Sequence, residues 1–375
     1  MLRRSHKKSK NGCEQCKQRH VKCDEGRPSC RLCTTTDLRC SYSTLNPPIT
    51  PNSNPSPDPN HDSTGTLSPT PNASNDVVNT QHMELFHHLI TNRDLFSLGD
   101  TVKDYKKTFE VCLQESFKAP HLLHSMLAFS ARHLSVLYPD RREEYRNQAN
   151  RLQMRAISLF YSTITEVDSS NCVAIVLFSV TLGHHVLADA LSCWGPKGLE
   201  GFLDFYLGCL KINRGIHNIA VSAWPLLVKS EIESVLSWSR KETAKEPTGS
   251  ECEALRSLIS EGMGFYGFEK EACYTAINHL QLGFDALISE DEGVRYRMIF
   301  QWTLLMSPEF QGLIKKRKPE ALVLLSYYGL LLHYGKTLWQ VKNAGELLVK
   351  HIQEYLGREW LIWLEYPIRM IQESN

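Results

Sequence analysis

The chain has 375 residues, of which 42% are hydrophobic, and it carries a formal net charge of +1. This length is typical of about two domains, and a charge so near zero indicates neither nucleic acid nor membrane as a partner. Twelve cysteines in a chain of this length are too sparse for a disulfide-stapled secreted scaffold. The basic start MLRRSHKKSK lacks the apolar core of a secretory signal. We therefore expect an intracellular protein.

Charge and cysteine are distributed unevenly along the chain. Residues 1–40 hold 11 Lys and Arg but only four acidic residues, a net charge of +7 that leaves −6 for the remainder. Six of the 12 cysteines also fall within residues 13–40. A basic head on a mildly acidic body is typical of a nucleic-acid-binding module joined to a second domain.

The next segment, residues 45–80, contains eight of the 17 prolines, is rich in Asn, Ser and Thr, and has no aromatic residue. With few backbone donors and little apolar surface to bury, it is predicted to be a disordered linker rich in proline. It shows no heptad repeat, so it predicts no coiled-coil dimer. The oligomeric state is left open.

Residues 81–375 show helical spacing of apolar residues, interrupted by Gly, Pro and short polar turns. One apolar stripe runs from Tyr145 to Ile164 and another from Leu347 to Leu356. The most apolar stretch, residues 172–191, carries His184, His185 and Asp189, which favours a buried core helix over a membrane span.

The fold class predicted from these segments has three parts. A small cysteine-rich domain occupies residues 1–44, the disordered linker occupies residues 45–80, and a large all-α regulatory domain of roughly a dozen helices occupies residues 81–375.

The cysteines of the head follow the pattern C-x2-C-x6-C-x6-C-x2-C-x6-C, which is a duplication of one three-cysteine unit. Two C-x2-C pairs in a reducing compartment indicate thiolate ligation of zinc rather than disulfides. The predicted metal ligands are Cys13, Cys16, Cys23, Cys30, Cys33 and Cys40.

The number of ligands constrains the site. One tetrahedral zinc would use four thiolates and leave two unused, whereas two zinc ions use all six if two sulfurs bridge. Cys13 and Cys30 begin the two halves of the duplication, so symmetry makes them the natural bridges. Because so short a head cannot fold on a hydrophobic core, the two zinc ions are expected to stabilise it.

Only the first half of the duplication is strongly cationic. Its six-residue stretch is KQRHVK, whereas the second half has the formally neutral TTTDLR. A short helix in the first half is therefore predicted to enter the major groove of double-stranded DNA. Its predicted DNA-contacting residues are Lys17, Arg19, His20 and Lys22. Each could instead be a solvated cation, and phosphate and base contacts cannot be distinguished from sequence.

The basic arm before the cluster, RRSHKKSK, is interpreted as a phosphate-contacting arm, a nuclear localisation signal or both; the alternative is an uncommitted basic tail. The predicted contacts in this arm are Arg3, Arg4, Lys7, Lys8 and Lys10.

Residues 12–42, GCEQCKQRHVKCDEGRPSCRLCTTTDLRCSY, resemble the six-cysteine binuclear zinc cluster of fungal transcription factors, including Pro28 two residues before the fourth cysteine. The preceding HKKS and the following VKCDE are similar to the corresponding segments of a narrower group, the sterol uptake control regulators. The segments LLHYGKTLWQ and LGREWLIWLEYP are less specifically similar to the C-terminal domain of that group.

The resemblance implies binding to CGG-type DNA triplets, nuclear residence and regulation of RNA polymerase II genes, often specific to one pathway, with the transcription machinery as partner. One departure is His20, where the family usually has Lys or Arg. Because a neutral imidazole offers one donor and one acceptor rather than a fixed cation, the base preference at this position is left open.

Other patterns are interpreted as structural. The G-x-G-x-x-G at residues 262–267 lacks a preceding strand and is predicted to be an inter-helix loop rather than a dinucleotide site. The pairs His87–His88 and His184–His185 and the spaced pair His121 and His124 lack partners at ligand spacing. The six cysteines from Cys112 to Cys273 are expected to be buried hydrophobes. Trp360 and Trp363 are expected in the core, with a ligand-pocket wall as the alternative.

No catalytic motif supports an enzyme. The leading hypothesis is a DNA-binding transcriptional regulator. The first alternative is a ligand-sensing receptor, in which a small lipophilic molecule such as a sterol or lipid binds the helical domain and controls the head. A protein-interaction module that uses the zinc cluster without DNA is a third hypothesis, which the charge of the head disfavours.

Overall fold

The chain divides into two compact units, residues Met1–Asn75 and Asp76–Asn375. The computed structural model describes residues 11–19, 21–26, 29–36, 40–42, 78–92, 95–96, 105–164, 166–195, 197–262 and 265–374. The basic arm, His20, Gly264 and nearly all of the predicted linker lie outside the described residues.

The first unit contains two five-residue helices, α1 (Glu14–Gln18) and α2 (Arg31–Thr35). Each begins directly after the first cysteine of one half of the duplication. The buried core of this unit consists of cysteines, with Leu32 and Tyr42 packed against it. A core of this kind buries too little apolar surface to be stable alone.

The second unit contains fifteen α-helices, somewhat more than the predicted dozen, and no strand among the residues described. They are α3 (Thr80–Thr91), α4 (Tyr105–Lys118), α5 (Pro120–Leu137), α6 (Arg142–Thr163), α7 (Cys172–Ser192), α8 (Gly198–Leu227), α9 (Glu233–Thr243), α10 (Glu253–Glu261), α11 (Gly267–Ala286), α12 (Glu292–Arg295), α13 (Arg297–Leu305), α14 (Pro308–Lys315), α15 (Pro319–Tyr334), α16 (Ala344–Leu356) and α17 (Leu361–Glu373).

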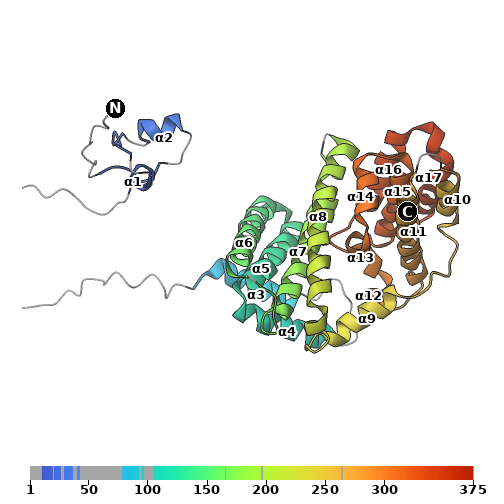
Figure 1. Ribbon diagram of the computed structural model, residues 1–375, viewed down its shortest axis with the longest axis horizontal. Helices are drawn as coiled ribbons and strands as arrows, with labels where there is room; N and C mark the ends of the chain where they lie inside the picture. The colour runs from blue at the N-terminus through green and yellow to red at the C-terminus, as the bar shows by residue number, and fades with distance from the viewer. Residues whose placement is uncertain are drawn as a thin grey trace, which may run out of the picture. The chain divides into compact units, whose positions relative to one another are not determined.

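Within this unit the longest helix, α8, lies between two groups of helices (Figure 1). Helices α3–α7 gather on one side of it, and α10, α11 and α13–α17 lie on the other. The second group surrounds α15, in which every residue from Ala321 to His333 is buried. A helix that is apolar on all sides is typical of the centre of a large core.

Helix α7 is long and apolar enough to cross a bilayer by length and composition, with a mean hydropathy of 1.7 over its best window. In the fold, 56% of that window is buried, and the helix packs against α4, α5 and α8. It carries the buried His185 and the partly exposed Asp189. These contacts agree with the prediction of a core helix.

Prolines begin several helices. Pro120 is the first residue of α5, and Pro139 opens the short 3-10 helix that precedes α6. A proline at this position suits a helix start because its missing N–H would have no intrahelical partner there.

The predicted apolar stripes are confirmed in part. In α6 the stripe is buried from Tyr145 to Ala156, but the helix ends at Thr163, so Ile164 lies beyond it. In α16 Leu348 and Ile352 are buried, whereas Tyr355, which lies within the predicted stripe, is 45% exposed. The buried face of α16 is rotated toward Ala344 and Val349.

Several single-residue predictions are corrected. Five of the six cysteines in the helical unit are buried, but Cys193 is only half-buried. Trp360 and Trp363 are half-buried at the edge of the core rather than inside it. Gly262 ends α10 and Gly267 begins α11, so the glycine pattern joins two helices.

Candidate metal centre and DNA-contacting helix

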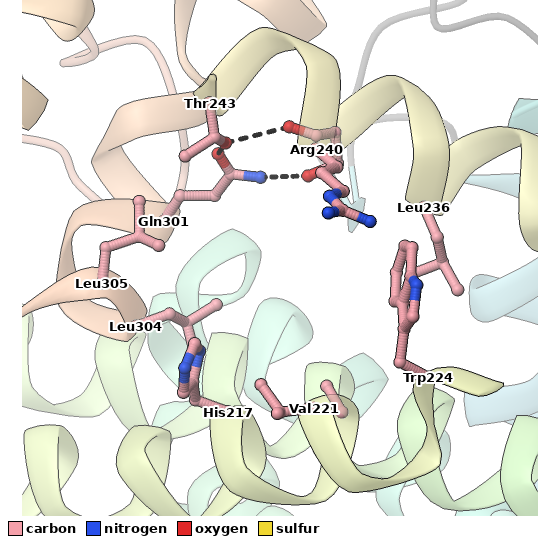
Figure 2. A pocket seen from close by; sticks show the side chains of 11 residues that line it. His217, Val221, Trp224, Leu236, Arg240, Thr243, Gln301, Leu304 and Leu305 are labelled. Atoms are coloured by element: carbon pink, nitrogen blue, oxygen red, sulfur yellow. Dashed lines mark hydrogen bonds between the residues drawn. The ribbon is translucent and has the colours of Figure 1, made fainter. Parts of the chain in front are cut away.

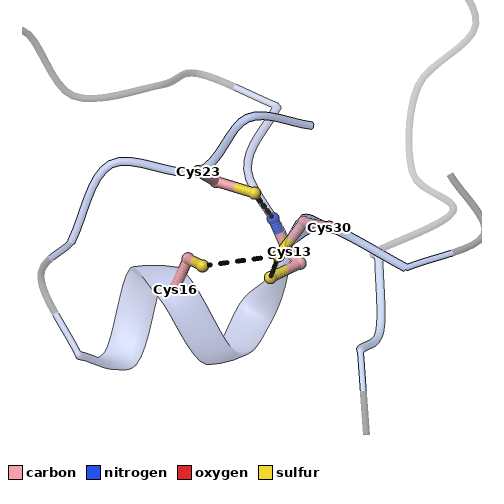
Figure 3. A group of neighbouring side chains, drawn as sticks. All are labelled: Cys13, Cys16, Cys23 and Cys30. Carbon is pink, nitrogen blue, oxygen red and sulfur yellow. Dashed lines mark hydrogen bonds between the residues drawn. The ribbon is translucent and has the colours of Figure 1, made fainter. Parts of the chain in front are cut away.

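The six cysteines of the head lie close together in two overlapping groups. Their sulfur atoms form two groups of four, and within each group all sulfurs lie within 4.8 Å of one another. The first group is Cys13, Cys16, Cys23 and Cys30, drawn in Figure 3. The second group is Cys13, Cys30, Cys33 and Cys40. The two residues common to both groups, Cys13 and Cys30, are the predicted bridging pair.

The sulfur–sulfur distances fit thiolates around zinc. The Sγ of Cys30 lies 3.7 Å from that of Cys13 and 3.7 Å from that of Cys16. The Sγ of Cys13 lies 3.6 Å from that of Cys33. A disulfide would need about 2.05 Å, whereas tetrahedral zinc with bonds of about 2.3 Å separates its sulfurs by about 3.8 Å. The donor set therefore fits zinc, and it excludes disulfides between these pairs.

The backbone repeats the symmetry of the sequence. The amide of Cys13 donates to the Sγ of Cys23 at 3.4 Å, and the amide of Cys30 donates to the Sγ of Cys40 at 3.3 Å. A third amide, that of Glu25, also donates to Cys23 at 3.3 Å. Such N–H donors stabilise a thiolate and orient it toward the metal.

The thiol pKa values follow from these contacts. Burial raises the pKa of Cys23, but the amides of Cys13 and Glu25 outweigh it and lower the pKa to about 7. The Cys30 amide likewise lowers the pKa of Cys40 to about 7. Burial raises the pKa of Cys33 to about 12. A buried thiol with so high a pKa ionises at neutral pH when a metal cation coordinates it.

Polar side chains hold the ends of the head together. The side-chain amide of Gln15 donates to the Ser41 hydroxyl, and the Ser41 amide donates to the Gln15 side-chain oxygen, both at 2.9 Å. Asp24 accepts the Arg31 amide at 3.0 Å at the start of α2. The Tyr42 hydroxyl donates to the Gly26 carbonyl at 2.8 Å. The spacing of the cysteines does not predict these hydrogen bonds, because they join residues from separate segments of the chain.

Three of the predicted DNA-contacting residues are described, and all three are exposed: Lys17 in α1, Arg19 at its end and Lys22 beyond it. One guanidinium nitrogen of Arg19 also donates to the Thr36 hydroxyl at 3.4 Å. The structure leaves the other six, namely His20, Arg3, Arg4, Lys7, Lys8 and Lys10, outside the described residues.

In α2 the described residues after Cys33 are threonines and present no cation, whereas the exposed Arg31 lies before Cys33. The threonine hydroxyls donate to carbonyl oxygens of the same helix or of its N-cap, Thr34 to Cys30 and Thr35 to Arg31. Exposed cations therefore follow α1, as the sequence predicted, and α2 offers hydroxyl groups already bonded to their own backbone.

Comparison with known families agrees with this geometry. Residues 11–47 match the Fungal Zn(2)-Cys(6) binuclear cluster domain, and residues 84–195, from α3 to just beyond α7, match the Fungal specific transcription factor domain. The chain therefore carries two domains of fungal Zn(2)-C6 transcription factors. Proteins with these domains are DNA-binding regulators of transcription, not enzymes, and the cysteine-rich domain is a binuclear zinc cluster.

Individual relatives divide into two kinds. The chain is 26% identical over 340 residues to the Zn(2)-C6 fungal-type transcription factor afumD of Aspergillus fumigatus, covering 86% of this chain and 84% of that protein. It is 58% identical to Sterol uptake control protein 2 of Saccharomyces cerevisiae, but over 43 residues, 12% of this chain and 5% of that protein. It is also 49% identical to Lysine biosynthesis regulatory protein LYS14 of that yeast, over 41 residues, 11% of this chain and 5% of that protein.

The short matches carry limited information on pathway. Two regulators whose names refer to sterol uptake and to lysine biosynthesis align with segments of nearly equal length. A match of 43 residues is too short to include both the cysteine-rich head and the C-terminal segment, so the likeness of that segment to sterol regulators stays a prediction.

Proposed function

We propose that this regulator acts in the nucleus and binds CGG-type triplets through α1, as a pathway-specific factor for RNA polymerase II genes. In this proposal residues 1–44 bind DNA, residues 45–80 tether the head, and residues 81–375 regulate it or recruit the transcription machinery. The observation that carries the proposal is the pair of four-thiolate groups beside exposed cations of α1.

All six cysteines are proposed as ligands of two zinc ions, with Cys13 and Cys30 bridging. When bound, zinc cross-links the thiolates and takes the place of an apolar core. The chain itself supplies the backbone N–H donors to Cys23 and Cys40 and presents the cationic side chains. Lys17, Arg19, His20 and Lys22 are proposed to contact the major groove, and the basic arm is proposed to contact phosphates.

The proposal is tested by selecting binding sites from random duplex DNA with the zinc-loaded full chain. We expect enrichment of a CGG-type triplet that disappears after chelation. A single triplet would indicate a monomer on DNA, and two triplets at fixed spacing would indicate a dimer. Failure to enrich any sequence at moderate salt with two zinc ions bound would overturn the proposal.

A ligand-sensing receptor is the second candidate, and a cavity in the helical unit favours it. In that case the same regulator would respond to a small lipophilic molecule. The third hypothesis, a protein-interaction module without DNA binding, is disfavoured by the exposed cations of α1.

A further inference from the structure

A cavity of about 500 Å³ lies between α8, α9 and α13. Figure 2 shows Arg240 and Trp224 on one side of the open space and His217 and Leu304 on the other. Its volume falls within the range of small-molecule sites, which are typically apolar with a few polar groups that fix orientation.

Most of the residues that α8 and α13 contribute to the lining are apolar. Val221, Leu304 and Leu305 are among them, and 60% of the Val221 side chain is exposed. Leu236 of α9 faces the same space, and no residue of α9 is buried. Apolar side chains of three helices thus border the open space, an arrangement that an apolar ligand would complete.

The polar wall offers hydrogen-bond donors. Arg297 is 6% exposed, forms no ion pair with a described carboxylate, and donates to the Thr243 hydroxyl and the Gln301 side-chain oxygen, both at 2.8 Å. The Gln301 side-chain amide in turn donates to the Ser239 hydroxyl. The Thr243 and Gln301 acceptors of this wall are therefore engaged by Arg297, and the Ser239 hydroxyl, which accepts from Gln301 and lines the cavity, retains a proton that a ligand can accept.

The cationic side chain of Arg240 lies at the same wall of the cavity. The guanidinium of Arg240 lies over the Trp224 ring, 5.3 Å from its centroid. Among the described residues its guanidinium forms neither an ion pair nor a hydrogen bond, and none of the eleven residues that line the cavity is acidic. Arginine presents paired donors that match a carboxylate.

We propose that this cavity binds a small amphipathic carboxylate. Its apolar body lies against Val221, Leu304 and Leu305, and its carboxylate accepts hydrogen bonds from Arg240 and the Ser239 hydroxyl. The ligand is either a flexible fatty acid or a rigid polycyclic acid, since both share this chemistry. This inference deepens the ligand-sensing candidate and does not depend on the zinc cluster.

The test uses the zinc-loaded full chain and the fluorescent fatty acid cis-parinaric acid as probe. We expect saturable binding at one site, with displacement by oleate or by lithocholate depending on whether the site prefers a flexible or a rigid body. The methyl esters of both competitors, which lack the negative charge, are expected to compete at least about tenfold less well.

Substitutions locate the site. Arg240→Gln is expected to weaken probe binding at least about tenfold and to abolish the difference between acid and ester. Lys241→Gln, at the adjacent exposed cation that does not line the cavity, is the matched control and should bind as the unaltered chain does. Val221→Trp is expected to fill the cavity and abolish binding of acid and ester alike.

Arg240 and Val221 are both exposed. The melting temperatures of the two variants should therefore change little, and this measurement establishes that the variants fold. Absence of saturable binding, equal binding by Arg240→Gln, or unimpaired binding by Val221→Trp would each overturn the inference. Sequence-specific DNA binding, measured on the same samples, tests the function proposed above separately, because neither residue belongs to the head.

Discussion

The sulfur atoms of Cys13 and Cys30 lie 3.7 Å apart, and both belong to each of the two four-thiolate groups. Cys16 and Cys23 belong only to the first group, and Cys33 and Cys40 only to the second. The two positions of the shared pair are equivalent in the duplication, since each precedes one of the short helices. Loss of a shared sulfur and loss of an unshared sulfur should therefore have different consequences.

Cys30→Ser is expected to lose both zinc ions, because it removes a ligand from both groups. Cys40→Ser removes a ligand from the second group alone and should retain about one zinc ion per chain. Zinc content is measured by mass spectrometry of the metal after dialysis. Cys193→Ser, at a half-buried cysteine of the helical unit, should retain two. Two zinc ions in Cys30→Ser would contradict the bridging assignment.

Arg19→Ala is expected to weaken binding to the selected DNA sequence by about 1–3 kcal/mol if the guanidinium reads a base. The control is Arg31→Ala, at an exposed arginine of α2 in the other half of the duplication; it should change binding little. Titrations on the selected site and on unrelated DNA measure both effects. An equal loss on the two DNAs would assign Arg19 to a phosphate instead.

Gly345→Ala is expected to destabilise the helical unit by about 1–3 kcal/mol. A Cβ at this position would lie against the carbonyl oxygen of Gly329 and the backbone nitrogen of His333, where α15 and α16 pack together. Gly208→Ala in α8 is the control, since nothing lies within 4 Å of the added atom, and it should stabilise by up to about 1 kcal/mol. Urea unfolding measures both, and equal midpoints would refute the close packing.

Acid is expected to destabilise the helical unit through its buried histidines. Burial, with the cations near it, lowers the pKa of His133 to about 3, and burial lowers that of His185 to about 4 despite nearby Asp189. Unfolded imidazoles have a pKa of about 6.5, so below that pH the unfolded chain binds more protons than the folded one. Stability should be full above pH 6.5 and fall progressively toward pH 4.

Urea midpoints followed by tryptophan fluorescence measure this dependence, because all seven tryptophans lie in the helical unit. His133→Phe should reduce the slope, since a phenyl ring can keep the stacking on Trp339 without titrating. A midpoint that stays constant between pH 6.5 and 4.5 would contradict the prediction.

Parts of the fold that depend on local pattern could be predicted. The stripe from Tyr145 to Ala156 and the helix starts at Pro120 and Pro139 follow from spacing and from the missing proline donor. The exposure of Tyr355 could not be predicted, because one residue of rotation about a helix axis decides which of several apolar side chains faces the core. That rotation is fixed by the neighbouring helices.

The metal chemistry follows from the amino-acid sequence. Six cysteines in a duplicated spacing define a two-zinc donor set whatever the rest of the chain does, because ligand number and spacing are local properties. The contact of Gly345 with Gly329, and the cavity that brings Arg240 to Val221 and Leu304, appear only once the chain is folded. These features join helices far apart in the chain, and their positions come from packing of the whole core, which no local pattern encodes.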